Sequence, residues 1–269
     1  MVKFTIYTWN YTSSIAICLL DADIVVDVSW DRTTTDPSWI QPAADALGAL
    51  QVYETTLGRR LTILDQVFPS ILLWLFPTVN EATKFAGSTT VLMTFPPPFN
   101  GTLNPHMAYE HGNEVFVPDL GGGKVWRIGR TGGPGDFSIH RFIPQPLGTG
   151  PRHTAIFDDT IYLLQETANL TAQTFLPNPT APSPPNATTV SDDVPADGTY
   201  AAAELLLSPT SLEYPHLYLY ASNRNIGGTP DPRGDSIAIF DPLTKPELTL
   251  VKQAFTCLIE IRGSLGLAR

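Results

Sequence analysis

Short apolar runs bounded by proline and glycine recur through this chain, and their spacing of about 8–12 residues constrains the fold more than any other feature. Phe4–Trp9, Leu61–Val67 and Ile161–Gln165 are examples. No run has the length and period of a convincing amphipathic helix, and the 25 prolines disfavour helices throughout. The pattern predicts an all-β fold, which could be a sandwich, a barrel or a propeller.

Repeats of about 45 residues can be drawn along the chain, each with a polar motif at a similar phase. This period is typical of the four-stranded blades of a β-propeller, and the chain would then hold about six blades. Residues 176–199 are rich in proline and aspartate, so we expect a long exposed loop there.

Composition narrows the choice of partners. The chain has 269 residues with 43% hydrophobic residues, which suffices for one large core. Its net charge of −10 argues against nucleic acid and anionic membrane surfaces, which both require a basic face. A small anionic substrate remains compatible with this charge if a few arginines are focused in a pocket. No apolar run is long enough to span a membrane.

Two further features concern cysteine and location. Cys18 and Cys257 each stand alone in an apolar run, which predicts buried thiols and gives no indication of a disulfide framework. We find no convincing signal peptide and expect a cytoplasmic protein. Secretion is the alternative, because the chain contains four glycosylation sequons, at Asn10, Asn100, Asn169 and Asn186.

Two histidines, an arginine and a carboxylate occur at predicted strand ends in a chain that is otherwise poor in charge. His106 precedes an apolar strand, where an imidazole could move a proton or serve as a structural hydrogen-bonding group. Arg152 and His153 follow Gly150 and Pro151, and the guanidinium suits a carboxylate or phosphate. The alternative is a turn with a surface cation. Glu166 ends a strand, where it could pair with an arginine or be solvated.

A second arginine, Arg224, follows the predicted strand Leu217–Ala221 together with Asn223. The pair could form another anion clamp or an ordinary loop. Several known templates are missing, since the chain has no Gly-x-Ser-x-Gly elbow, no His-Glu-x-x-His and no Cys-x-x-Cys. No cluster has convincing metal-ligand spacing, so we predict no metal.

Seven motifs occur in an order that resembles the seven-bladed propeller lactonase family, which includes 3-carboxy-cis,cis-muconate lactonizing enzyme and propeller-type 6-phosphogluconolactonase. They are Asn-Pro-His-Met (104–107), Val-Phe-Val-Pro-Asp-Leu-Gly (115–121), Gly-Pro-Arg-His (150–153), the strand end at Glu166, Ala-Ala-Glu-Leu (202–205), Tyr-Ala-Ser-Asn-Arg (220–224) and Asp-Ser-Ile-Ala-Ile-Phe (235–240). The resemblance is good over residues 96–240 and is strongest to the fungal muconate-cyclase-like branch.

The resemblance implies one β-propeller domain over residues 1–269, with catalytic groups that converge on a central channel. It implies lactone hydrolysis or formation on an anionic lactone or muconate-like molecule, without cofactor or metal. The residues that it makes catalytic are His106, Arg152, Glu166 and Arg224, where the arginines bind the anion and the histidine moves a proton. We further predict that His153 and Asn223 contact the substrate.

The sequence departs from the family in three places. Gly122-Gly123 stands where relatives usually carry an acidic residue, the blade around residues 65–95 is short, and the last blade looks incomplete after residues 260–263. These departures leave a second hypothesis open. In that reading the chain is a propeller that has lost catalysis and serves as a binding scaffold.

Overall fold

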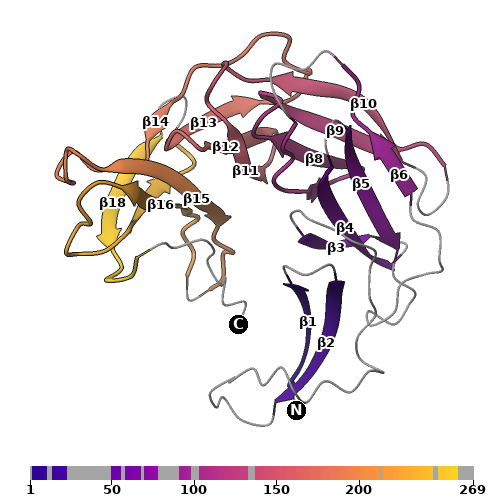
Figure 1. Ribbon diagram of the computed structural model, residues 1–269, viewed down its shortest axis with the longest axis horizontal. Coiled ribbons are helices and arrows are strands. Elements are labelled where there is room, and N and C mark those ends of the chain that lie inside the picture. Colours follow the sequence, from indigo (N-terminus) through magenta and orange to yellow (C-terminus); the bar gives the residue numbers. More distant parts are fainter. Residues whose placement is uncertain are drawn as a thin grey trace.

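The protein is all-β in a computed structural model (Figure 1). The structure describes residues 2–10, 14–22, 50–55, 58–67, 70–77, 91–97, 103–132, 137–212, 214–244 and 248–259, with side chains from residue 95 onward, except that of residue 130. Within these residues the strands form four four-stranded antiparallel sheets and one two-stranded sheet. No helix in the described part is long and apolar enough to cross a membrane.

Each four-stranded sheet is a blade made of four consecutive strands. The N-terminal hairpin is β1 (Val2–Asn10) and β2 (Ser14–Ala22). The first blade is β3 (Leu50–Thr55), β4 (Gly58–Val67), β5 (Ser70–Pro77) and β6 (Val91–Thr94). The second is β7 (Tyr109–His111), β8 (Glu114–Asp119), β9 (Lys124–Arg130) and β10 (Phe137–Pro144).

The third blade is β11 (Pro151–Phe157), β12 (Thr160–Gln165), β13 (Asn169–Thr174) and β14 (Ala187–Thr188). The fourth is β15 (Thr199–Leu207), β16 (Leu219–Gly227), β17 (Ser236–Asp241) and β18 (Thr249–Phe255). The blades lie side by side along an arc, with β6, β10, β14 and β18 toward the outside (Figure 1). The first strands of neighbouring blades are in contact, as β3 is with β7, β7 with β11, and β11 with β15.

Packing between blades explains why both faces of β12 carry apolar side chains. Tyr162 and Leu164 pack toward the fourth blade, with Leu219 and Phe240. Ile161 and Leu163 pack toward the second blade, in a cluster that includes Phe116, Val125 and Ile143. A strand covered on both faces is buried along its whole length, and all six residues of β12 are buried. Burial of both faces therefore holds the third blade in place against its neighbours.

The structure confirms the all-β expectation and corrects several details. The predicted exposed loop at residues 176–199 contains β14, which pairs with β13 and completes the third blade, and Thr189 just after it is fully buried. The described residues form four four-stranded blades, and the expectation of about six blades for the whole chain stays a prediction. Within residues 65–95, where a shortened blade was predicted, the structure describes β5 and β6, the last two strands of the first blade. Cys257 is exposed, so the prediction of a buried thiol is wrong there.

Other expectations concern residues that the structure does not describe. The side chain of Cys18, the sequon at Asn100 and the C-terminal segment 260–263 all lie outside what the structure describes.

Candidate active site

Five of the six predicted site residues meet at one end of the inner strands. Arg152 and His153 open β11, Glu166 follows β12 directly, and Arg224 lies in β16. His106 comes from the segment that precedes β7. Three blades therefore contribute to one cluster of cations, imidazoles and a carboxylate.

Glu166 joins the two arginines. Its Oε2 accepts a hydrogen bond from Arg152 Nη1 at 2.8 Å, and its Oε1 accepts one from Arg224 Nη2 at 3.1 Å. Both guanidiniums are nearly buried, while the glutamate side chain remains 30% exposed. One carboxylate thus balances part of the charge of two cations and holds them side by side, at a place that solvent can reach.

Backbone carbonyls of β15 fix the same guanidiniums from the other side. Arg152 Nε donates to the carbonyl of Ala203 at 2.9 Å, and Arg224 Nη2 donates to that of Ala202 at 3.1 Å. A guanidinium has five N–H groups in all. Among the described residues, Arg152 Nη2 and the Nη1 and Nε of Arg224 have no acceptor. Arg224 Nε is buried, so Arg152 Nη2 and Arg224 Nη1 are the groups available to an anionic ligand.

A β-bulge brings Arg152 and His153 to the same site although they are adjacent in a strand. Side chains normally alternate between the two faces of a strand. In β11, however, Pro151 pairs with Gln165 and His153 with Leu164, so Arg152 is an extra residue. Such a bulge interrupts the alternation and re-aims side chains. Gly150, directly before β11, has a φ of 63°, and a Cβ at this position would lie 3.0 Å from Cβ of Glu166.

Asp119 holds the segment that carries His106. Its buried carboxylate accepts hydrogen bonds from the backbone N of Asn104 at 2.7 Å, from Gly122 N at 2.7 Å and from Trp126 Nε1 at 2.9 Å. The backbone N of His106 then donates to the carbonyl of Pro118 at 2.9 Å. The Asp-Leu-Gly motif therefore has a structural explanation, since it anchors the histidine segment to the second blade.

The two imidazoles lie together, with 4.9 Å between the ring centroids of His106 and His153. The pKa of His106 is lowered to about 2, mainly by burial and then by the charges of Arg152, His153 and Arg224, in that order. Its Nδ1 is buried and has no hydrogen-bond partner among the described residues. His106 is therefore a neutral imidazole at physiological pH.

Glu204 is a member of the cluster that the sequence did not single out. Its Oε1 pairs with Nδ1 of His153 and also accepts a hydrogen bond from Leu205 N at 3.0 Å. The signal was present in Ala-Ala-Glu-Leu (202–205), which resembled the family but received no role. The reason for its orientation is a second bulge, since Ala203 and Glu204 together oppose one residue of β16.

Asn223 lies apart from this group, contrary to its prediction as a substrate contact. Its side-chain amide is buried and bonds at both ends to Thr189, which donates from Oγ1 to Asn223 Oδ1 at 2.6 Å and accepts from Nδ2 through its carbonyl. The register of β16 is regular at this point, so Asn223 and Arg224 face opposite sides of the strand. Asn223 ties β14 to the fourth blade.

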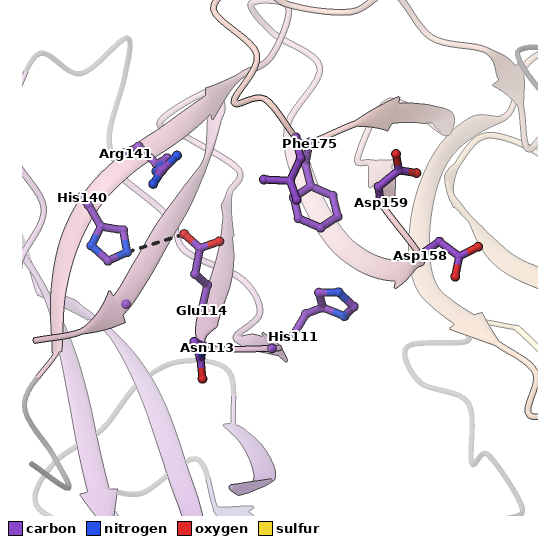
Figure 2. A pocket seen from close by; sticks show the side chains of 11 residues that line it. His111, Asn113, Glu114, His140, Arg141, Asp158, Asp159 and Phe175 are labelled. Atoms are coloured by element: carbon purple, nitrogen blue, oxygen red, sulfur yellow. Dashed lines mark ion pairs between the residues drawn. The ribbon is translucent and has the colours of Figure 1, made fainter. Parts of the chain in front are cut away.

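A separate pocket of about 680 Å³ lies at the opposite end of the same inner strands (Figure 2). It opens between the turn at Asp158 and Asp159, which follows β11, and the side chains of His140 and Arg141 on β10. Glu114 faces His140 there, with 3.5 Å between Oε1 and Nε2. The pocket and the arginine cluster are thus separated by the length of β11, about 20 Å. Among the described residues no group of three or more His, Cys, Asp or Glu could hold a metal ion.

Comparison with known proteins gives the class to which this fold and site belong. The model of the family described as lactonase, 7-bladed beta-propeller, matches residues 94–257. The chain therefore belongs to the lactonase family of seven-bladed β-propellers. A search of curated protein sequences found no match for this chain.

Solved structures share the fold at low sequence identity. A protein from Lactobacillus plantarum is 16% identical with a TM-score of 0.52, and the alignment covers 94% of this chain and 82% of that one. A proposed 6-phosphogluconolactonase from Bacteroides uniformis is 19% identical with a TM-score of 0.57, covering 93% and 67%. Another, from Bacteroides fragilis, is 20% identical with a TM-score of 0.53, covering 85% and 64%. The chain spans about two thirds of the length of the two Bacteroides proteins.

Proposed function

We propose that this chain is a lactone hydrolase for a small anionic lactone, of the 6-phosphogluconolactone or carboxymuconolactone type. The observation that carries the proposal is the pair of guanidiniums held on Glu166, with N–H groups left over beside two imidazoles. Two fixed guanidiniums can bind a carboxylate or phosphate by several charge-assisted hydrogen bonds. The family and the proposed activity of the Bacteroides proteins support the same class of substrate.

Hydrolysis follows from this arrangement in two steps. Water attacks the lactone carbonyl carbon while an imidazole of the cluster accepts its proton, and N–H groups of Arg152 or Arg224 stabilise the negative charge that develops on the carbonyl oxygen. The ring C–O bond then breaks, and the leaving alkoxide takes the proton back. The product is one hydroxy acid, whose carboxylic acid group then releases its proton to water. Glu166 keeps the two guanidiniums in place throughout.

Lactone formation on a muconate-like molecule is the second reaction that these groups could serve. There the carboxylate oxygen of the substrate bonds to one carbon of a carbon–carbon double bond, and an acid of the cluster delivers a proton to the other carbon. The resemblance to the muconate-lactonizing members motivates this alternative. It needs the same anion-binding arginines, so only the substrate distinguishes it from hydrolysis.

A non-catalytic binding propeller is the third candidate. It is motivated by Gly122-Gly123, which stands where members of the family usually carry an acidic residue. In this reading the arginines would bind an anionic molecule without turnover.

We further propose that the protein acts in the cytoplasm.

A panel of lactones tests these proposals on the purified full-length chain. The panel contains 6-phosphogluconolactone, uncharged glucono-δ-lactone and muconolactones, with circular dichroism to confirm β structure in the same sample. We expect turnover of at least one anionic lactone and weaker turnover of the uncharged one. A folded sample that turns over none of them, but binds 6-phosphogluconate, would support the binding propeller and contradict the enzyme.

A further inference from the structure

Two imidazoles lie in the cluster, but only one of them is built to accept a proton. His153 has a carboxylate partner, Glu204, at its Nδ1. His106 has no partner at Nδ1 among the described residues, so nothing there fixes its tautomer. A general base needs a group that orients it and stabilises the imidazolium that it becomes.

The hydrogen bonds decide which nitrogen of His153 carries the proton. Glu204 Oε1 already accepts from the backbone N of Leu205 at 3.0 Å, and a carboxylate oxygen can only accept. Nδ1 of His153 must therefore be the donor. Nε2 is then left with its lone pair, and it has no partner among the described residues. The His153 side chain is 12% exposed, so this lone pair can reach a water molecule.

The backbone of β15 is shaped to hold Glu204 against His153. Ala203 and Glu204 form a bulge opposite Ser222, and the backbone N of Glu204 donates to Ser222 Oγ at 3.0 Å. The same bulge presents the carbonyl of Ala203 to Arg152 Nε. One irregularity in β15 thus positions both the guanidinium and the imidazole of the neighbouring blade. Bulges that re-aim side chains are common beside active sites.

We infer that His153 is the general base of the proposed lactone hydrolysis and that Glu204 is the residue that positions it. The inference rests on the proposed function. In the first step the water oxygen bonds to the lactone carbonyl carbon, and the water proton moves to His153 Nε2. In the second the ring C–O bond breaks, and the leaving oxygen takes that proton from Nε2. His106 remains neutral and acts only as a hydrogen-bonding neighbour, because its burial, and after that the charge of Arg152, opposes a charge on it.

Three variants and one control test the assignment by steady-state kinetics over a range of pH. His153→Asn keeps a donor toward Glu204 and removes the base, so we expect kcat to fall by about 100-fold or more. Glu204→Gln removes only the charge, so we expect kcat to fall by about 10-fold or more with KM unchanged. The acid limb of its profile, which is the fall of kcat at low pH where the base is protonated, should move to lower pH. The reason is that the carboxylate no longer stabilises the imidazolium. A purely structural role for Glu204 would leave that limb in place.

His106→Asn should lower kcat by about 10-fold and leave the acid limb where it is in the wild type. His140→Asn is the matched control, because it removes the imidazole of the other histidine–glutamate pair, at the far end of the inner strands. We expect wild-type kinetics from it. Thermal unfolding of every variant shows whether the fold is retained.

The outcomes separate this inference from the proposed function. If the wild type is active and kcat of His153→Asn stays within about threefold of it, the inference is overturned and the lactonase proposal is left intact. Loss of the acid limb in His106→Asn, with the limb kept in His153→Asn, also overturns it. A folded wild type with no turnover of any lactone overturns both. Loss of turnover in His153→Asn with a shifted limb in Glu204→Gln supports the inference.

Discussion

The guanidinium of Arg152 donates from Nη1 to Oε2 of Glu166 at 2.8 Å, and this bond links the start of β11 to the residue that follows β12. Arg224 from the next blade shares the same carboxylate. Because both guanidiniums are nearly buried, Glu166 has a structural role in addition to any part in catalysis. The first prediction concerns this double role.

Replacement of Glu166 by alanine should destabilise the fold. The change leaves two neighbouring cations without their shared counter-charge, and the loss of a buried ion-pair partner costs about 3–5 kcal/mol. Glu166 is partly exposed, so we expect about 1–3 kcal/mol in urea unfolding. Glu166→Gln is the control that keeps the size and an acceptor oxygen. If Glu166→Ala unfolds at the wild-type urea concentration, the two arginines do not depend on this carboxylate.

The two arginines should determine selectivity for anionic substrates. Arg152→Gln and Arg224→Gln each remove charge-assisted hydrogen bonds to the ligand, worth about 1.5–3 kcal/mol. We expect KM for 6-phosphogluconolactone to rise about 10- to 100-fold in either variant, with little change for glucono-δ-lactone. Arg141→Gln is the control, because Arg141 lies on β10 beside the other pocket. An equal rise for charged and uncharged lactones would contradict an anion-binding role.

His106 should make the fold sensitive to acid. Its pKa in the folded protein is about 2, well below the ordinary value of 6.5, so the unfolded chain takes up a proton first as the pH falls. Stability from this group is complete above pH 6.5 and is lost progressively below it, by up to about 1.4 kcal/mol per pH unit. Urea unfolding at about pH 7 and about pH 5 measures the difference. His106→Asn should flatten this dependence, and an unchanged slope would show that His106 titrates normally.

Asn223 should affect stability without affecting substrate affinity. Its buried amide bonds to Thr189 at both ends, and each buried group left without a partner costs about 1–3 kcal/mol. Asn223→Ala should therefore lower the free energy of unfolding by about that amount and leave KM within about twofold. Asp192→Ala, at an exposed position, is the control. A large rise in KM with unchanged stability would restore Asn223 as a substrate contact.

The comparison of Asn223 with His153 shows how far the sequence alone could lead. Both residues adjoin a predicted catalytic arginine in sequence, and both were predicted to contact substrate. Strand alternation sends Asn223 to the opposite side from Arg224, which the period of two could have indicated. His153 lies on the same side as Arg152 only because of the bulge at Arg152, and no residue pattern in β11 predicts that bulge.

The hairpins were predictable for a different reason. Local turn chemistry at Gly112-Asn113 and at Asp158-Asp159 separates apolar runs, and the structure places turns at both. Glu204 and β14 were not predictable in this way. Glu204 reaches His153 through contacts between blades, and β14 is a two-residue strand inside a proline-rich segment, defined by its pairing with β13.

A crystal structure of the full chain with 6-phosphogluconate, the product of the proposed reaction, tests the central claim most directly. We predict that the phosphate or carboxylate of the ligand lies within hydrogen-bonding distance of free N–H groups of both Arg152 and Arg224, with its other end beside His153. Binding of the product in the pocket of Figure 2, or no binding near the two arginines, would contradict the account.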